Sequence, residues 1–149
     1  MKISIFDLDN CISNDSWRKD IIDFKTEAAH NERWHEYHSL SNLDKYENSH
    51  MIDQELADDN KIVIVTGRPE RYRNQTIGWL DAHGINYFSL LMRDNKDKRS
   101  SVEVKRALVK TFICENEPVE VQVAYDDRQD IVDMYKEIGI VNARILRID

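Results

Sequence analysis

Short apolar runs recur along the chain, and a segment with helical spacing follows most of them. The run from Ile62 to Val65 is apolar and β-branched throughout, which is typical of a strand buried on both faces. We expect five such strands, at residues 2–8, 61–65, 85–92, 119–125 and 143–148. The sequence therefore predicts an α/β fold: a doubly wound, Rossmann-like, five-stranded parallel sheet with the strand order 3-2-1-4-5.

Helix-end signals place helices between these strands. The three predicted helices run from Pro69 to His83, from Ser100 or Ser101 through Phe112, and from Asp127 to Ile138. Proline in a first turn, serine at a cap and glycine after a last turn are the usual signs of helix ends.

Residues 13–60 interrupt this alternation. The stretch is polar, carries several aromatic side chains, and has helical fragments at 17–24 and 50–56 without a strong strand. Loops at the carboxyl edge of an open parallel sheet form its binding crevice. We therefore expect a single domain, 1–149, with a small, mainly helical, cap-like insertion at about 13–60.

Composition limits the classes of function. The 149 residues are enough for one domain with its own core, and the formal charge of −7 opposes an extended nucleic-acid surface. Cys11 and Cys114 do not suggest a disulfide framework. Because Met1 is followed directly by a strand and no apolar run approaches a membrane span, we expect a cytoplasmic protein without a membrane partner.

Polar residues gather where the predicted strands end. They are Asp7 and Asp9 after strand one, Thr66, Gly67 and Arg68 after strand two, Lys105 on the helix after strand three, and Asp126 and Asp127 after strand four. Period-2 geometry sends Asp7 and Asp9 to the same side. If strand four pairs beside strand one, the acidic groups converge in one crevice, where their oxygens suit Mg²⁺.

The chain resembles the haloacid dehalogenase-like phosphatases in four motifs and in their order. The motifs are Asp7-Leu8-Asp9-Asn10-Cys11, Val65-Thr66-Gly67-Arg68, the isolated Lys105, and Tyr125-Asp126-Asp127-Arg128. One such motif is a weak signal, but four in the right order and strand context are a strong one. Within that superfamily the chain is most similar to the 3′-phosphatase domain of phage polynucleotide kinase, which shares Arg18 nine residues after Asp9.

The resemblance implies catalytic and metal-binding roles. Asp7 would be the nucleophile that attacks phosphorus to give an aspartyl-phosphate, and Asp9 would be general acid and then general base. Mg²⁺ would be held by the Asp7 carboxylate, the Asp9 backbone carbonyl and the pair Asp126 and Asp127, either of which could be the direct ligand. The implied enzyme is a Mg²⁺-dependent phosphomonoesterase.

The resemblance also implies how the substrate binds. Thr66, Gly67 and Lys105 would hold the transferring phosphoryl group, while Arg18 and Arg68 would face the rest of the substrate. The implied partner is a nucleotide or a polynucleotide 3′-phosphate end, with a 5′-nucleotide or another phosphorylated small molecule as the alternative. Two departures from the family pattern stand near the site: Asn10-Cys11 replaces the commoner Gly-Thr, and Ser101 replaces an aspartate.

Several of these residues also have simpler interpretations. Arg18 and Arg68 are, by default, solvated surface charges, and the mixed-sign run Arg93–Arg99 is a solvated loop or one local contact for a polyanion. His35 and His38 have the spacing of a zinc pair but lack a third ligand, which favours packing instead. Trp34 and Tyr37 either stack a base or anchor the insertion.

A phospho-switch module like a bacterial receiver domain is the competing class. Receivers also combine an acidic pair, a phosphorylatable aspartate, a threonine and a lysine on a parallel sheet. Their acidic pair comes first and their lysine last, whereas here Lys105 precedes Asp126 and Asp127. The order of motifs therefore favours the enzyme.

Overall fold

The sheet of this computed structural model has the predicted topology. The structure describes residues 1–22 and 30–149, and all pairings in the five-stranded sheet are parallel, in the order β5-β4-β1-β6-β7. The strands are β1 (Lys2–Phe6), β4 (Lys61–Pro69), β5 (Ser89–Arg93), β6 (Glu120–Asp126) and β7 (Ala143–Ile145). The predicted order 3-2-1-4-5 is confirmed.

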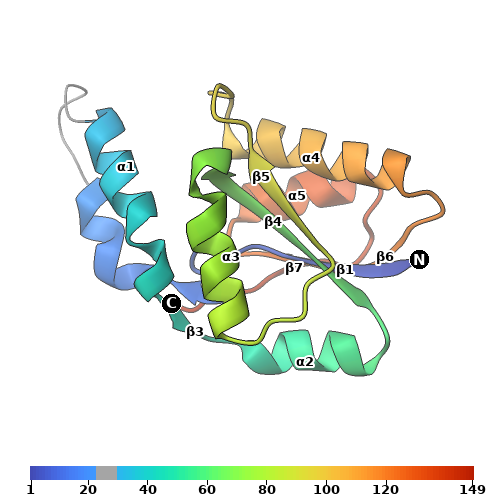
Figure 1. Cartoon of the computed structure of the whole chain (residues 1–149). Coiled ribbons are helices and arrows are strands. Elements are labelled where there is room, and N and C mark those ends of the chain that lie inside the picture. Colours follow the sequence, from blue (N-terminus) through green and yellow to red (C-terminus); the bar gives the residue numbers. More distant parts are fainter. Residues whose placement is uncertain (23–29) are drawn as a thin grey trace.

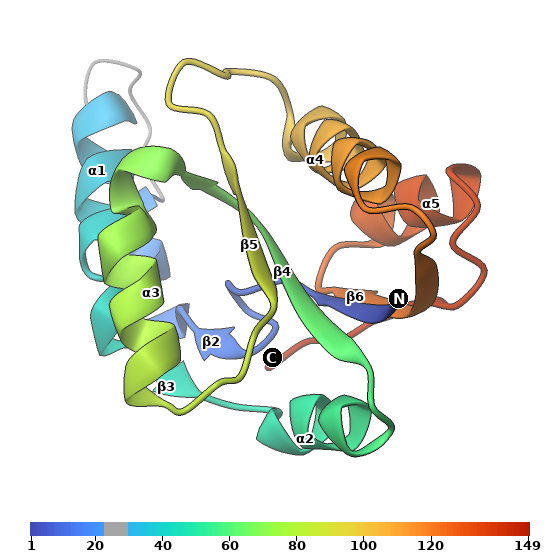
Figure 2. The ribbon, with the colours of Figure 1, turned by 45° about the vertical axis from the view of Figure 1, so that its right-hand side comes forward.

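Helices cover both faces of this sheet (Figures 1 and 2). The helices α2 (Ser49–Ala57) and α3 (Arg73–Ala82) lie on one face, and α4 (Ser101–Glu115) and α5 (Gln129–Glu137) lie on the other. Alternate residues of β4 serve the two cores: Ile62 and Ile64 pack toward α2 and α3, while Val63 and Val65 pack toward α4 and α5. This double burial explains why residues 62–65 of the strand are apolar throughout.

The end of β4 differs from the prediction. The strand continues through Thr66, Gly67 and Arg68 to Pro69, whose ψ of 148° is extended, and Pro69 pairs with Arg93 of β5. A short 3-10 helix, η4 (Glu70–Tyr72), follows, so α3 begins at Arg73 rather than at Pro69. Proline's fixed φ suits an extended segment as well as a first helical turn, so the sequence signal was ambiguous. Gly67 and Arg68 therefore lie within the strand, at an irregularity between the paired residues Thr66 and Pro69.

The other predicted helix ends agree with the structure. The Ser100 hydroxyl caps α4 by accepting a hydrogen bond of 3.3 Å from the Glu103 backbone N–H. Gly84 and Gly139 follow α3 and α5 with φ values of 64° and 99°, a region that glycine enters without steric cost.

The insertion is only partly a cap. Its described residues form a two-stranded antiparallel ribbon of β2 (Ser13–Asn14) and β3 (Lys45–Tyr46), the 3-10 helices η1 (Ser16–Ile22) and η3 (Ser41–Leu43), and α1 (His30–Ser39). The predicted helical fragment 17–24 is found as η1 up to Ile22, and residues 23 and 24 lie outside the described residues. The fragment 50–56 forms α2, which packs on the sheet because Ile52 belongs to the core.

Two further expectations can be compared with the structure. Both cysteines are free: Cys11 is buried and Cys114 is exposed. In the part of the chain that is described, none of the helices is long and apolar enough to cross a membrane.

We predict that Ile52→Ala destabilises the protein by about 2–5 kcal/mol, because it leaves a cavity between α2 and the sheet. The measurement is urea denaturation followed by circular dichroism. Gln54→Ala, at an exposed position of the same helix, is the matched control and should change the free energy of unfolding by less than about 0.5 kcal/mol. Equal effects of the two substitutions would contradict the packing of α2 on the sheet.

Candidate active site

A tight turn places the first pair of acidic side chains at the carboxyl end of β1. The Asp7 backbone N–H donates to the Tyr125 carbonyl at 3.2 Å, so Asp7 is still aligned with β6. The Leu8 carbonyl then accepts hydrogen bonds from the backbone N–H groups of Cys11, Ile12 and Ser13. Asn10 has a φ of 59° in this turn, a conformation that asparagine tolerates better than most residues. The departure at Asn10 is thus compatible with the turn.

Carboxylates from two strands meet beside Lys105. Asp7, Asp126 and Asp127 each offer an oxygen, and these oxygens lie within 4.8 Å of one another. The Lys105 ammonium donates to Asp7 Oδ1 at 2.9 Å and to Asp126 Oδ2 at 2.6 Å. Asn10 also donates to Asp127 Oδ2 at 3.3 Å. The structure therefore brings together the side chains of Asp7, Asp126 and Asp127, three of the four residues that were expected to hold a metal.

Burial strongly perturbs the ionisation of this cluster. Loss of hydration, followed by repulsion from Asp126, raises the pKa of Asp7 well above its usual range. Loss of hydration likewise raises the pKa of Asp126, although Lys105 opposes this. Burial alone would lower the pKa of Lys105, but Asp126 and Asp7 outweigh it and raise that pKa. When all three carboxylates are ionised, one ammonium leaves the cluster with two formal negative charges, and a divalent cation would favour this ionised form.

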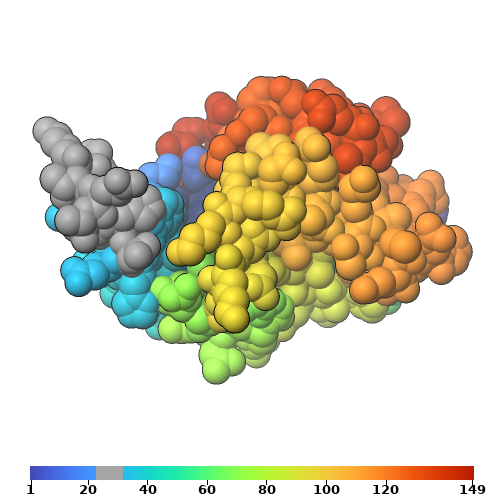
Figure 3. All heavy atoms as spheres, turned by 90° about the horizontal axis from the view of Figure 1, so that it is seen from above, coloured from blue at the N-terminus to red at the C-terminus, as the bar shows by residue number. Residues whose placement is uncertain are grey.

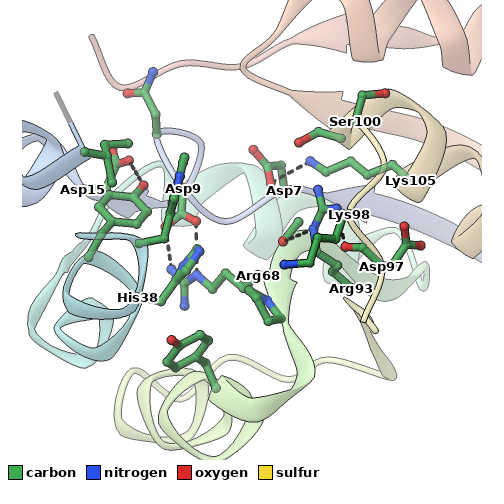
Figure 4. A pocket seen from close by; sticks show the side chains of 18 of the residues that line it. Asp7, Asp9, Asp15, His38, Arg68, Arg93, Asp97, Lys98, Ser100 and Lys105 are labelled. Atoms are coloured by element: carbon green, nitrogen blue, oxygen red, sulfur yellow. Dashed lines mark hydrogen bonds and ion pairs between the residues drawn. The ribbon is translucent and has the colours of Figure 1, made fainter. Parts of the chain in front are cut away.

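Two arginines clamp Asp9. Arg68 donates from Nε to Asp9 Oδ2 at 3.1 Å and from a terminal nitrogen to Oδ1 at 2.7 Å (Figure 4). Arg18 donates to Asp9 Oδ1 at 2.6 Å. Burial by itself would raise the pKa of Asp9, but Arg68 and then Arg18 hold it well below its usual range. Asp9 is therefore a fixed carboxylate whose orientation depends on both arginines.

Arg18 lies behind Asp9 within the protein. Its side chain is 0% exposed, and it donates two hydrogen bonds to Asp44, at 2.8 and 2.6 Å, and one to the Tyr37 carbonyl at 3.0 Å. The interpretation of Arg18 and Arg68 as solvated surface charges is wrong, since neither side chain is exposed. The expectation that Arg18 faces the substrate differs from what we observe, because every nitrogen of its guanidinium contacts a protein group.

Sequence reasoning missed Asp44. Besides the bonds from Arg18, its carboxylate accepts hydrogen bonds from Ser13 Oγ at 2.6 Å and from Trp17 Nε1 at 2.8 Å. Its backbone carbonyl accepts from Trp79 Nε1 at 2.8 Å, which ties the insertion to α3. No motif marks Asp44, because its importance comes only from contacts between segments distant in sequence.

The end of β4 lies across the crevice from the acidic cluster. The Thr66 hydroxyl is buried and accepts a hydrogen bond of 3.2 Å from the Arg68 backbone N–H. The Gly67 carbonyl accepts from Arg93 Nε at 2.9 Å, and a Cβ on Gly67 would lie 3.5 Å from Ser101 Oγ. Ser101, which replaces the family's aspartate, therefore lies close to the Thr-Gly-Arg motif.

These groups surround a cavity of about 860 Å³. Asp7, Asp9, Gly67, Arg68 and Lys105 line its base. Asp15 and His38 lie on one side of Asp9, whereas Asp97, Lys98 and Ser100 lie beyond Asp7 (Figure 4). Seen from above, the segment after β5 stands between the insertion and α4 (Figure 3). The run Arg93–Arg99 is thus part of the cavity wall, which a fully solvated loop would not be.

The histidine pair does not form a zinc centre in the described part of the chain. The acidic cluster around Asp7 is the one group of three or more potential ligands found among the residues described. His35 contacts the Tyr72 hydroxyl at 2.6 Å, and the buried His38 packs among Trp34, Tyr37 and Tyr72. The expectation that these histidines pack or form hydrogen bonds is confirmed.

Comparison with known proteins agrees with this geometry. The family model for the polynucleotide kinase PNKP phosphatase domain matches residues 2–147. The chain therefore belongs to this family of haloacid dehalogenase-like phosphatase domains. None of the curated protein sequences matches the chain.

Solved structures share the fold. A chain of the Pnkp1/Rnl/Hen1 complex superposes with a TM-score of 0.74 at 24% identity over 97% of this chain. A chain of the Pnkp1/Rnl/Hen1 RNA repair complex has a TM-score of 0.74 at 22% identity over 99% of this chain. The chain spans 45% and 43% of the length of these two relatives. A candidate phosphatase from Clostridium difficile has a TM-score of 0.64 at 15% identity, over 93% of this chain and 81% of its own.

We predict that Arg18→Ala destabilises the protein by about 3–5 kcal/mol, because it leaves the buried Asp44 carboxylate without its main cation. Chemical denaturation gives the free energy of unfolding directly. Arg128→Ala is the control, since the half-exposed pair of Arg128 with Asp130 should contribute less than about 1 kcal/mol. A loss below about 1 kcal/mol for Arg18→Ala would show that the buried network does not support the fold.

Proposed function

We propose that this chain is a Mg²⁺-dependent phosphomonoesterase that acts through an aspartyl-phosphate on the 3′-phosphate ends of polynucleotides or on 3′-nucleotides. The observation that carries the proposal is the convergence of Asp7, Asp126, Asp127 and Lys105 beside the clamped Asp9. The family match supports the phosphatase chemistry.

The residues present fit a magnesium ion. All three side chains offer carboxylate oxygens, which hard cations prefer, and the two formal negative charges of the cluster match a divalent ion. Asp7, Asp126 and Asp127 would hold the ion, together with the Asp9 backbone carbonyl. When bound, Mg²⁺ would neutralise the phosphate and reduce its repulsion from the Asp7 carboxylate.

Asp7 is the proposed nucleophile. One of its oxygens already contacts Lys105 at 2.9 Å, so the lysine fixes the carboxylate and places a positive charge where the phosphoryl group would arrive. The Asp7 oxygen would form a bond to phosphorus while the bond from phosphorus to the leaving oxygen breaks. The Gly67 backbone and the Thr66 hydroxyl would support the same phosphoryl group from the end of β4.

Asp9 is the proposed proton carrier. It would protonate the leaving oxygen and then accept a proton from the water that hydrolyses the aspartyl-phosphate. Arg68 and Arg18 favour the anionic form of Asp9, which is the form that accepts the proton from water. An approaching anionic phosphate acts on Asp9 in the opposite sense to the two arginines, because its negative charge favours the protonated form of the Asp9 carboxyl group.

We expect the wild-type protein to hydrolyse an aryl phosphate, and Asp7→Asn to lower kcat by roughly 10³-fold or more, because the amide is a poor nucleophile. Release of inorganic phosphate measures the rate, and circular dichroism checks that the variant is folded. Asp130→Asn, at an exposed position on α5, is the matched control. Unchanged turnover in folded Asp7→Asn protein would contradict the assignment of Asp7 as the nucleophile.

The same assay separates the possible substrates. Oligonucleotides with a 3′-phosphate or a 5′-phosphate, 3′- and 5′-nucleotides and sugar phosphates would be compared by kcat/KM. The proposal expects the 3′-phosphates to be preferred. A preference for 5′-nucleotides or sugar phosphates would leave the phosphatase chemistry in place but reject the proposed substrate.

We predict that chelation abolishes activity and that Mg²⁺ restores it. Because the folded cluster binds the ion and the unfolded chain does not, Mg²⁺ at 100 times its Kd should stabilise the protein by about 2.7 kcal/mol. Thermal denaturation with and without Mg²⁺ measures this, and Asp127→Asn should reduce the shift while Asp130→Asn should not. A Tm that does not respond to Mg²⁺ would contradict the proposed site.

A further inference from the structure

Asn10, one of the two departures from the family pattern, makes side-chain contacts that the commoner glycine could not make. The backbone of the turn does not require asparagine, because glycine adopts a φ of 59° without steric cost. Asn10 is nevertheless buried, with 7% of the residue exposed. The shape of the turn therefore does not account for the amide group.

The Asn10 amide nitrogen donates to two carboxylates. One hydrogen bond goes to Asp149 Oδ1 at 2.7 Å, and the other goes to Asp127 Oδ2 at 3.3 Å. Ionised carboxylates only accept hydrogen bonds, so the amide nitrogen and not the amide oxygen must face them. Both hydrogens of the amide are thus used, and the shorter bond to Asp149 sets the direction of the longer bond to Asp127.

Residues 146–149, which include Asp149, are themselves fixed to the ends of the strands. The Ile148 backbone N–H donates to the Asn10 carbonyl at 3.1 Å. Arg147 Nε donates to the Asp127 carbonyl at 2.7 Å, although the arginine is exposed. This segment therefore holds the backbone of both Asn10 and Asp127, and it keeps Asp149 beside the Asn10 amide.

Asp127 is held differently from the neighbouring Asp126. Both Asp126 oxygens have donors, Lys105 at 2.6 Å and the Arg128 backbone N–H at 3.1 Å. In the described part of the chain, the Asn10 amide is the only N–H group that donates to the Asp127 carboxylate. Because an amide is neutral, it orients this carboxylate without offsetting the negative charge that would attract a cation.

We propose that Asn10, held by Asp149, is a positioning residue that orients the Asp127 carboxylate for the divalent cation. The inference rests on the proposed function, because it concerns the same magnesium site. A carboxylate that is already oriented loses less side-chain freedom when the ion binds, so the affinity for the ion is higher. Asparagine at position 10 thus strengthens metal binding in this chain.

The first test replaces Asn10 by the glycine that is commoner in the family. Asn10→Gly should raise the Kd for Mg²⁺ roughly three- to tenfold, as expected for the loss of one hydrogen bond to a metal ligand. Titration of the full chain with MgCl₂, followed by calorimetry, measures the Kd. Asp59→Gly is the matched control, because Asp59 also has a positive φ, 63°, but is exposed and outside the cavity lining. It should keep the wild-type Kd.

The second test examines the bond from Asn10 to Asp149. Asp149→Ala and Asp149→Asn both remove the negative charge, but only the asparagine keeps an oxygen that can accept from the Asn10 amide. The difference between the two variants therefore reports the hydrogen bond and not the charge. We expect Asp149→Asn to bind Mg²⁺ more tightly than Asp149→Ala. Equal Kd values for the two variants would overturn the inference.

The rate of aryl phosphate hydrolysis gives a readout that a general loss of structure would not give. The ratio of the wild-type rate to the Asn10→Gly rate should fall as Mg²⁺ is raised, because a higher concentration fills the weaker site. A ratio that is the same at all Mg²⁺ concentrations would contradict the inference.

The titrations also separate failure of this inference from failure of the proposed function. If the wild-type protein and Asn10→Gly bind Mg²⁺ with the same Kd, the positioning role of Asn10 falls and the proposed magnesium site stands. If the wild-type protein binds no Mg²⁺, the proposed site falls, and the inference falls with it.

Discussion

The structure depends on how buried carboxylates are neutralised at the carboxyl edge of the sheet. Asp9 and Asp44 face Arg18 and Arg68, so this group has no formal net charge and is closed by the protein itself. Asp7 and Asp126 pair with Lys105, and when they and the neighbouring Asp127 are all ionised, this cluster has two formal negative charges. The first group fixes geometry, and the second is the group for which we propose a bound cation and, with it, a phosphate.

The insertion after β1 contributes residues both to the charged group around Asp9 and to the lining of the cavity. It supplies Arg18 and Asp44, which hold Asp9 from behind, and the Trp34 and His38 rings, which line the cavity next to it. The Trp79 contact with Asp44 ties this insertion to α3. A single segment therefore both supports the proposed proton carrier and lines the cavity beside it.

Much of the fold and of the site could be predicted because the signals are local. The apolar run Ile62–Val65 indicated a strand buried on both faces, and Ser100 marked the start of α4. Predictions were less accurate where the same sequence signal is compatible with two backbone conformations. Pro69 fits both an extended strand end and a first helical turn, and only its pairing with Arg93 decides between them. The sequence assigned the helical fragment 50–56 to the cap-like insertion. In the structure this fragment packs on the sheet, because Ile52 belongs to the core.

The sequence by itself determined the parallel sheet, the order of the acidic and basic motifs along it, and the residues Asp7, Asp126 and Lys105 as a group, since strand ends in such a sheet share one edge. Tertiary structure alone decided that Arg18 is buried behind Asp9 and that Asp44 balances its charge. The physical reason is that neighbouring residues alone show the alternating pattern of a strand. The partner of a buried charge, in contrast, depends on how segments that are far apart in the chain pack together.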